Sequence, residues 1–123
     1  MNKKKKILVA EDEKPMAHAL ELKLSNSGFD VKTVFSGKEA LESVEKKQFD
    51  LIFLDLMMPE VDGFTVLTQL KEKGSKVPVV VLSNLGQEND LQRAKDLGAV
   101  DYFVKSDTPI AEIVKYANKI IKE

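Results

Sequence analysis

The 123-residue sequence contains no cysteine and no tryptophan, and it has a single histidine. The absence of cysteine excludes disulfide bonds and thiol chemistry, and it is compatible with a reducing compartment. The one histidine, His18, lies in a helical pattern two positions from Met16, which predicts a solvent-facing side chain without a catalytic role. These absences exclude several common kinds of catalytic and metal site.

Long apolar runs and an excess of basic charge are also missing. No run approaches the roughly 20 apolar residues that a membrane helix needs. The apolar stretch 7–10 follows four lysines, but it is too short for a signal peptide and acids follow it at once. With 19 basic and 20 acidic residues, the net charge of −1 gives no reason to expect direct nucleic-acid binding. We therefore expect a cytoplasmic protein that binds neither membranes nor nucleic acid.

Apolar residues are abundant, at 43% of the sequence, and they fall into short runs. The runs cover residues 7–10, 31–34, 51–54, 79–82 and 102–104. Three of the runs are apolar throughout, which is typical of strands covered on both faces. The length and composition predict one domain over residues 1–123.

Helical patterns separate these runs. The strongest apolar stripe covers residues 110–121. Ser36 and Glu39 have the spacing of a capping box, and Thr108 with Pro109 suits the N-cap and first residue of the last helix. Three glycines follow helical patterns where a left-handed residue often ends a helix: Gly28, Gly74 and Gly98. The alternation predicts a doubly wound α/β fold with a five-stranded parallel sheet.

Polar residues follow four of the five predicted strands. Ligands of open α/β sheets bind beyond the carboxyl ends of the strands, at the point where the strand order reverses. In the order 2-1-3-4-5, the first and third strands are neighbours at that point. The residues expected there are Glu11, Asp12, Asp55, Ser83 and Lys105.

Three clustered carboxylates repel one another and raise one another's pKa values. Such a cluster needs cations, and oxygen ligands suit a hard divalent ion, Mg²⁺ before a transition metal. Each residue alone has an ordinary explanation, since Glu11 and Asp12 could charge a helix N-terminus and Ser83 could lie in a turn. Their coincidence at four strand ends favours a site. A metal beside a carboxylate, a cation and a hydroxyl is the apparatus of phosphoryl transfer.

At these residues the chain resembles the receiver domains of two-component response regulators. The resemblance runs through "KKILVAEDE", "LIFLDLMMPEVDG", "VPVVVLSN" and "DYFVKS" and covers the whole chain. It implies a flavodoxin-like fold and a phosphoryl group passed to Asp55 from a phosphohistidine on a sensor histidine kinase or phosphotransfer protein. The implied Mg²⁺ ligands are Glu11, Asp12, Asp55 and the Met57 backbone carbonyl. Lys105 is then the phosphate-binding lysine, and Ser83 and Tyr102 are the switch residues.

The resemblance also implies how the signal leaves the domain. Movement of Ser83 makes room for Tyr102 to rotate, which reshapes the face formed by helix four, strand five and helix five for a downstream protein target. The chain is then not an enzyme in the usual sense, because it catalyses only its own phosphorylation and dephosphorylation, and we expect no DNA-binding effector domain in it. Met57 and Leu85 occupy the positions flanking the hydrolytic water, which predicts slow dephosphorylation. Ser106 follows Lys105 where most receivers have proline, so the sequence leaves open whether that peptide is cis or trans. We expect Lys105 itself to remain on the fifth strand and to keep its contact with the phosphate.

Two functions of other classes stay open from the sequence. A Mg²⁺-dependent phosphatase of the haloacid-dehalogenase type also places an aspartate after a strand, but it needs a second aspartate two residues later, where Met57 stands. A flavodoxin-like nucleotide or flavin binder is the other alternative. The chain has no G-x-x-x-x-G-K-[ST] loop, and its first strand leads into acids.

Overall fold

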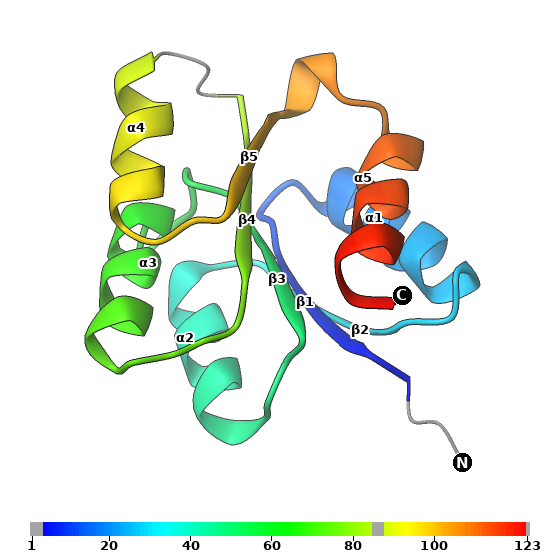
Figure 1. Ribbon diagram of the computed structural model, residues 1–123, viewed down its shortest axis with the longest axis horizontal. Coiled ribbons are helices and arrows are strands. Elements are labelled where there is room, and N and C mark those ends of the chain that lie inside the picture. Colours follow the sequence, from blue (N-terminus) through cyan, green and yellow to red (C-terminus); the bar gives the residue numbers. More distant parts are fainter. Residues whose placement is uncertain (1–3, 85–87, 123) are drawn as a thin grey trace.

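The computed structural model describes residues 4–84 and 88–122, and in this part of the chain five strands alternate with five α-helices (Figure 1). The strands are β1 (Lys6–Ala10), β2 (Asp30–Val34), β3 (Leu51–Leu54), β4 (Val79–Ser83) and β5 (Asp101–Val104). The helices are α1 (Lys14–Asn26), α2 (Gly37–Lys46), α3 (Gly63–Glu72), α4 (Glu88–Asp96) and α5 (Ile110–Ala117). A 3₁₀ turn, η1 (Lys105–Asp107), precedes α5, and a π-helical turn, η2 (Asn118–Lys122), follows it.

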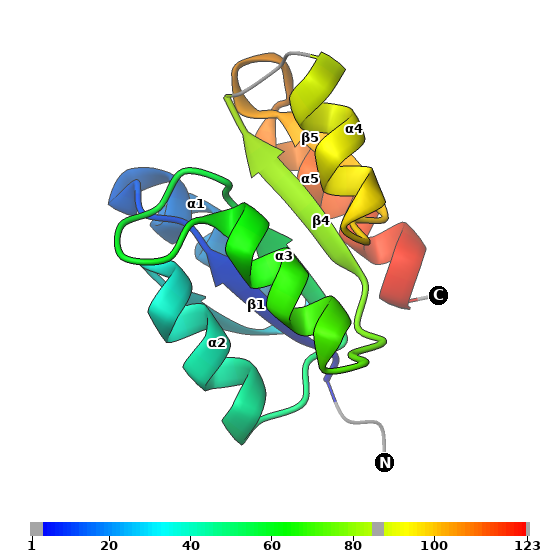
Figure 2. The ribbon, with the colours of Figure 1, turned by 90° about the vertical axis from the view of Figure 1, so that its left-hand side faces the viewer.

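The sheet is parallel throughout, with the strand order β2-β1-β3-β4-β5. Both the doubly wound architecture and the strand order predicted from the sequence are confirmed. Figures 1 and 2 show α1 and α5 on one face of the sheet and α2, α3 and α4 on the other. Every residue of β3 and β4 is buried, as the uninterrupted apolar runs predict.

The core has two halves because successive residues of a strand point to opposite faces of the sheet. Leu8 and Ile52 pack with the residues of α2, α3 and α4, whereas Ile7 and Phe53 pack with those of α1 and α5. Both faces of the central strands are therefore closed to solvent. The ends of the strands remain the place where polar side chains can gather.

Helix termini follow most of the expected signals. The Ser36 hydroxyl accepts a hydrogen bond from the Glu39 amide at 3.2 Å, and the Glu39 carboxylate accepts one from the Phe35 amide at 2.8 Å. The three glycines named above all have positive φ, at 98°, 73° and 107°. These observations confirm the capping box of α2 and the glycine signals after α1, α3 and α4.

The segment after β5 departs from the sequence prediction in two ways. Lys105 was expected on the strand, but β5 ends at Val104 and Lys105 begins the 3₁₀ turn. Pro109 is the N-cap of α5 and not its first residue, because the Thr108 hydroxyl turns back and donates to the Val104 carbonyl at 2.9 Å. None of the peptide bonds in the described residues is cis, so the bond between Lys105 and Ser106 is trans.

Two further expectations concern the surface. His18 is exposed, as predicted. No helix within residues 4–84 or 88–122 is both long enough and apolar enough to cross a membrane.

Candidate functional site

The register of the sheet brings the acids after β1 and β3 together. Ala10 and Leu54 are paired as the last residues of their strands, and the Asp55 amide donates to the Ala10 carbonyl at 2.9 Å. Glu11, Asp12 and Asp55 each offer a carboxylate oxygen, and these oxygens lie within 4.8 Å of one another. The clustering predicted from the strand ends is therefore present in the structure.

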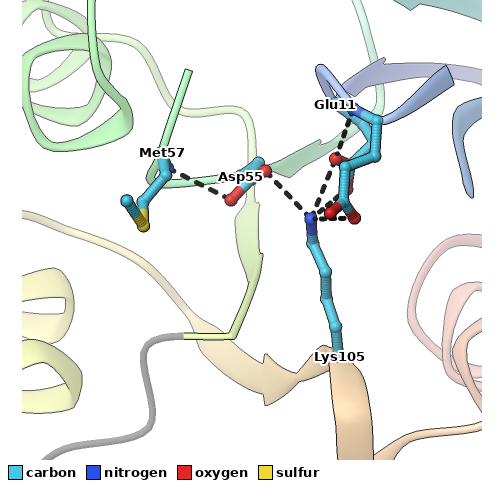
Figure 3. Close-up of polar contacts among 5 residues, drawn as sticks. Glu11, Asp55, Met57 and Lys105 are labelled. Atoms are coloured by element: carbon cyan, nitrogen blue, oxygen red, sulfur yellow. Dashed lines mark hydrogen bonds and ion pairs between the residues drawn. The ribbon is translucent and has the colours of Figure 1, made fainter.

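Lys105 reaches this cluster from the turn that follows β5 (Figure 3). Its Nζ donates hydrogen bonds to Glu11 Oε2 at 2.8 Å and to Asp55 Oδ2 at 2.9 Å. The side chains of Lys105, Glu11 and Asp55 are 7%, 1% and 4% exposed. A buried ammonium group thus bridges two buried carboxylates. The move of Lys105 from the strand into the turn has not removed it from the site.

The site holds more negative charge than Lys105 balances. Burial raises the pKa of Glu11 from 4.5 to about 7, although hydrogen bonds from Lys105 and from the Glu13 amide oppose this. Burial also raises the pKa of Asp12, and the neighbouring Asp55 adds to the effect. Burial by itself lowers the pKa of Lys105. The hydrogen bonds from Lys105 to Glu11 and Asp55 outweigh this effect, so the pKa of Lys105 lies above its ordinary value. A second cation would lower the electrostatic cost of keeping these carboxylates charged.

The loop between β3 and α3 fixes the Asp55 side chain. The Met57 amide donates to Asp55 Oδ1 at 3.1 Å, and Figure 3 shows this contact on the side away from Lys105. The Met57 side chain itself is 61% exposed. Gly63, the first residue of α3, packs tightly against this segment, since a Cβ there would lie 2.5 Å from the Asp55 carbonyl oxygen and 2.7 Å from Leu56 Cα. Only glycine allows the helix to begin so close to the strand end.

Ser83 and Tyr102 lie on the two neighbouring strands β4 and β5. Both side chains are buried, and their hydroxyl groups are hydrogen-bonded to each other. Burial raises the pKa of the Tyr102 hydroxyl, and the bond with Ser83 partly offsets the rise. The structure thus has Tyr102 turned inward and in contact with Ser83. Its rotation in response to Ser83 stays a prediction.

One acid in the site was not predicted from the sequence. Glu13 Oε1 lies 3.3 Å from Lys105 Nζ, so this ammonium group faces three carboxylates. The signal was the third acid of "EDE", but its place at the start of a helix suggested only an N-terminal charge. Leu85, expected to flank the hydrolytic water, lies outside the described residues.

The residues present fit a hard divalent cation. Glu11 Oε1 lies 2.7 Å from Lys105 Nζ, but it is buried and has no partner in hydrogen-bond geometry. The side chains that could serve as ligands all offer carboxylate oxygens, and burial raises the pKa values of Glu11 and Asp12. Such oxygen-rich, charge-excess sites suit Mg²⁺.

We expect Asp12→Ala to weaken Mg²⁺ binding by at least about tenfold without destabilising the metal-free protein. The reason is that the carboxylate serves as a ligand when metal is bound, whereas without metal its burial and the neighbouring Asp55 together disfavour its charged form. Isothermal titration calorimetry measures the affinity, and thermal unfolding in EDTA measures the stability. Glu112→Ala, which removes an exposed acid from α5, is the control. Unchanged Mg²⁺ affinity together with a large loss of stability in EDTA would contradict the prediction.

Comparisons with known proteins agree with this geometry. The family model described as the response regulator receiver domain matches residues 7–118. The alkaline phosphatase synthesis transcriptional regulatory protein PhoP of Bacillus subtilis is 40% identical over 105 residues, which are 85% of this chain and 44% of that protein. The probable transcriptional regulator ycf27 of Porphyra purpurea is 38% identical over 125 residues, covering 97% of this chain and 51% of that protein. The chain spans about half the length of the curated relatives it matches.

A solved structure supports the same relationship. The receiver domain of the Francisella response regulator 1452 superposes with a TM-score of 0.90 at 33% sequence identity. The match covers 96% of this chain and 97% of that one. The similarity therefore extends over nearly all of both chains.

Proposed function

Because the chain belongs to the response regulator receiver domain family, with the flavodoxin-like fold of that family, we propose that Asp55 is the residue that accepts the phosphoryl group. Membership of this family argues against the haloacid-dehalogenase and flavodoxin-type alternatives. Residues 1–123 then act as one receiver domain of a two-component system. The donor is a sensor histidine kinase or a phosphotransfer protein, and the reaction takes place in the cytoplasm.

The observation that carries the proposal is the position of Asp55 between Lys105 and the acids after β1. Asp55 directly follows a fully buried strand, its Oδ1 is held by the Met57 amide, and its Oδ2 is held by Lys105. A carboxylate fixed in this way loses little further conformational entropy when it attacks an incoming phosphorus atom. A strand end that needed only a polar residue would not require these partners.

The chemistry follows from these positions. A carboxylate oxygen of Asp55 attacks the phosphorus of the phosphohistidine, an O–P bond forms, the P–N bond breaks, and the imidazole nitrogen leaves with the bonding electron pair. Lys105 donates hydrogen bonds to the phosphoryl oxygens, and the Ser83 hydroxyl donates another. The residues that would hold Mg²⁺ are Glu11, Asp12, Asp55 and the Met57 backbone carbonyl. When bound, the ion supplies neutralisation of charge on the transferring group.

The same proposal includes an output. The contact between Ser83 and Tyr102 links the site to β5, the edge strand of the sheet. Figure 2 shows α4, β5 and α5 together at this edge. Recruitment of Ser83 by the phosphoryl group breaks its bond with Tyr102, and the face formed by α4, β5 and α5 changes for a downstream protein target. We propose that the chain signals through this protein contact, and not by binding nucleic acid itself or by turning over another substrate.

The phosphorylated state should be long-lived, and Met57→Asn should shorten it. The Met57 thioether cannot orient an attacking water by hydrogen bonding, whereas an amide can, and a group that orients the nucleophile contributes about 10²–10⁴-fold in such chemistry. To test this, the phosphodonor is removed and the decay of the phosphorylated protein is followed in excess Mg²⁺. Leu22→Asn, at an apolar side chain with similar exposure, is the control. Decay of Met57→Asn at the wild-type rate would show that Met57 does not control the lifetime.

The proposed function is tested by incubation with acetyl phosphate in Mg²⁺ and in EDTA. We expect a mass gain of one phosphoryl group in Mg²⁺ only, and we expect hydroxylamine to remove it, because an acyl phosphate is cleaved by this nucleophile. A gain that is equal in EDTA, or that resists hydroxylamine, would contradict the proposal.

A further inference from the structure

Glu13 occupies the N-cap position of α1, yet its side chain does not cap the helix. N-cap residues usually accept a hydrogen bond from the second or third amide of their own helix. Glu13 Oε1 instead lies 3.3 Å from Lys105 Nζ, and the Glu13 side chain remains 58% exposed. The carboxylate is thus directed across the site toward a side chain that follows β5.

Glu13, Glu11 and Lys105 form a closed ring of contacts. The Glu13 amide donates to Glu11 Oε2 at 3.0 Å, and Lys105 Nζ donates to the same oxygen at 2.8 Å. The third side of the ring is the contact between Lys105 Nζ and Glu13 Oε1. The ring includes neither Asp12 nor Asp55, so it does not depend on the two acids at the centre of the chemistry.

This independence matters when Asp55 reacts. Formation of an acyl phosphate removes the carboxylate charge that Lys105 faces at 2.9 Å. A divalent cation at Glu11, Asp12 and Asp55 would neutralise Glu11 as well. Glu13 lies outside that carboxylate cluster, so among the three carboxylates around Lys105 it is the one that neither reacts nor would bind the metal.

We propose that Glu13 is a positioning residue, which holds the Lys105 ammonium group where it meets the incoming phosphoryl group. The inference rests on the function proposed for Asp55 and adds a residue to it. Loss of Glu13 should slow phosphorylation, since a partner that orients a functional side chain is typically worth on the order of tenfold or more. Simple electrostatics predicts the opposite sign, because removal of a negative charge should speed the approach of an anionic donor.

The test compares the phosphorylation rates of the wild type and five variants with acetyl phosphate at saturating Mg²⁺. We expect Glu13→Ala to be on the order of tenfold slower than wild type. Glu13→Gln keeps an oxygen atom at the same distance from the backbone, so its phosphorylation rate should lie between those of Glu13→Ala and the wild type. Asp107→Asn removes an exposed acid from η1 and should not be slower than wild type. In a Lys105→Met background, Glu13→Ala should cause no further decrease, because Glu13 acts only through Lys105.

A second measurement does not use phosphorylation. An amine-acylating reagent labels accessible lysines, and mass spectrometry compares Lys105 with the exposed Lys38 in the same chain. Glu13→Ala should raise the labelling of Lys105 severalfold in Mg²⁺, whereas Asp107→Asn should not. The inference is overturned if the Glu13→Ala variant is phosphorylated as fast as the wild type, or if its Lys105 is labelled to the same extent as in the wild type. Failure of the wild type to become phosphorylated would instead overturn the function proposed for Asp55, and the labelling would still decide the role of Glu13.

Discussion

Replacement of Lys105 by methionine is expected to lower the free energy of unfolding by about 3–5 kcal/mol in EDTA near neutral pH. The substitution leaves Glu11 and Asp55 buried without the ammonium group that bridges them at 2.7–2.9 Å. A buried charge that loses its partner keeps its desolvation cost, which is why breaking such a pair costs far more than breaking a pair in water. Urea unfolding monitored by circular dichroism measures the effect, and Mg²⁺ should restore part of the lost stability.

The matched control is Lys73→Met. Lys73 Nζ lies 2.8 Å from Glu45 Oε2 and so makes an ion pair as short as those of Lys105, but both side chains are largely exposed. Solvent screens such pairs, so we expect little change in the unfolding midpoint. Equal effects of the two substitutions would show that burial does not set the strength of the Lys105 contacts.

The stability of the metal-free protein should fall as pH rises from about 4.5 to about 7. Burial raises the pKa of Glu11 from 4.5 to about 7, so the folded state binds more protons than the unfolded state in this window. The stability that protonated Glu11 contributes is fully present below its unfolded pKa and is lost as pH rises through its folded pKa. The loss is on the order of 3 kcal/mol between pH 4.5 and 8.

Urea unfolding in EDTA at a series of pH values measures this dependence. Glu11→Gln should remove most of it, because the amide is neutral throughout. The control Glu112→Gln replaces an exposed acid, and this variant should show the same pH dependence of stability as the wild type. A wild-type protein as stable at pH 8 as at pH 5 would contradict the account of Glu11.

The convergence of Glu11, Asp12 and Asp55 could be predicted because it depends only on chain direction and strand order. Parallel strands end at the same edge, and fully apolar runs such as 51–54 identify the central strands directly. The same reasoning could predict that Lys105 belongs to the site, since it follows β5.

Contacts that depend on side-chain reach could not be predicted in this way. Lys105 lies in a turn because Thr108 bonds back to Val104, and sequence spacing does not distinguish this from a longer strand. Glu13 resembled any acid at a helix N-terminus, and its contact with Lys105 joins residues 92 positions apart. The hydrogen bond between Ser83 and Tyr102 likewise depends on the orientation of two buried side chains.

Locating the phosphoryl group on the chain is the most direct test of the role proposed for Asp55. Wild type and Asp55→Asn are treated with acetyl phosphate and Mg²⁺, reduced with borohydride to trap the acyl phosphate, digested, and mapped by mass spectrometry. Asp55→Asn is the closest available replacement, since it keeps the size of the side chain. The account predicts one modified residue in the wild type, Asp55, and no modification of the mutant. Modification at another residue of the wild type, or equal modification of Asp55→Asn, would contradict it.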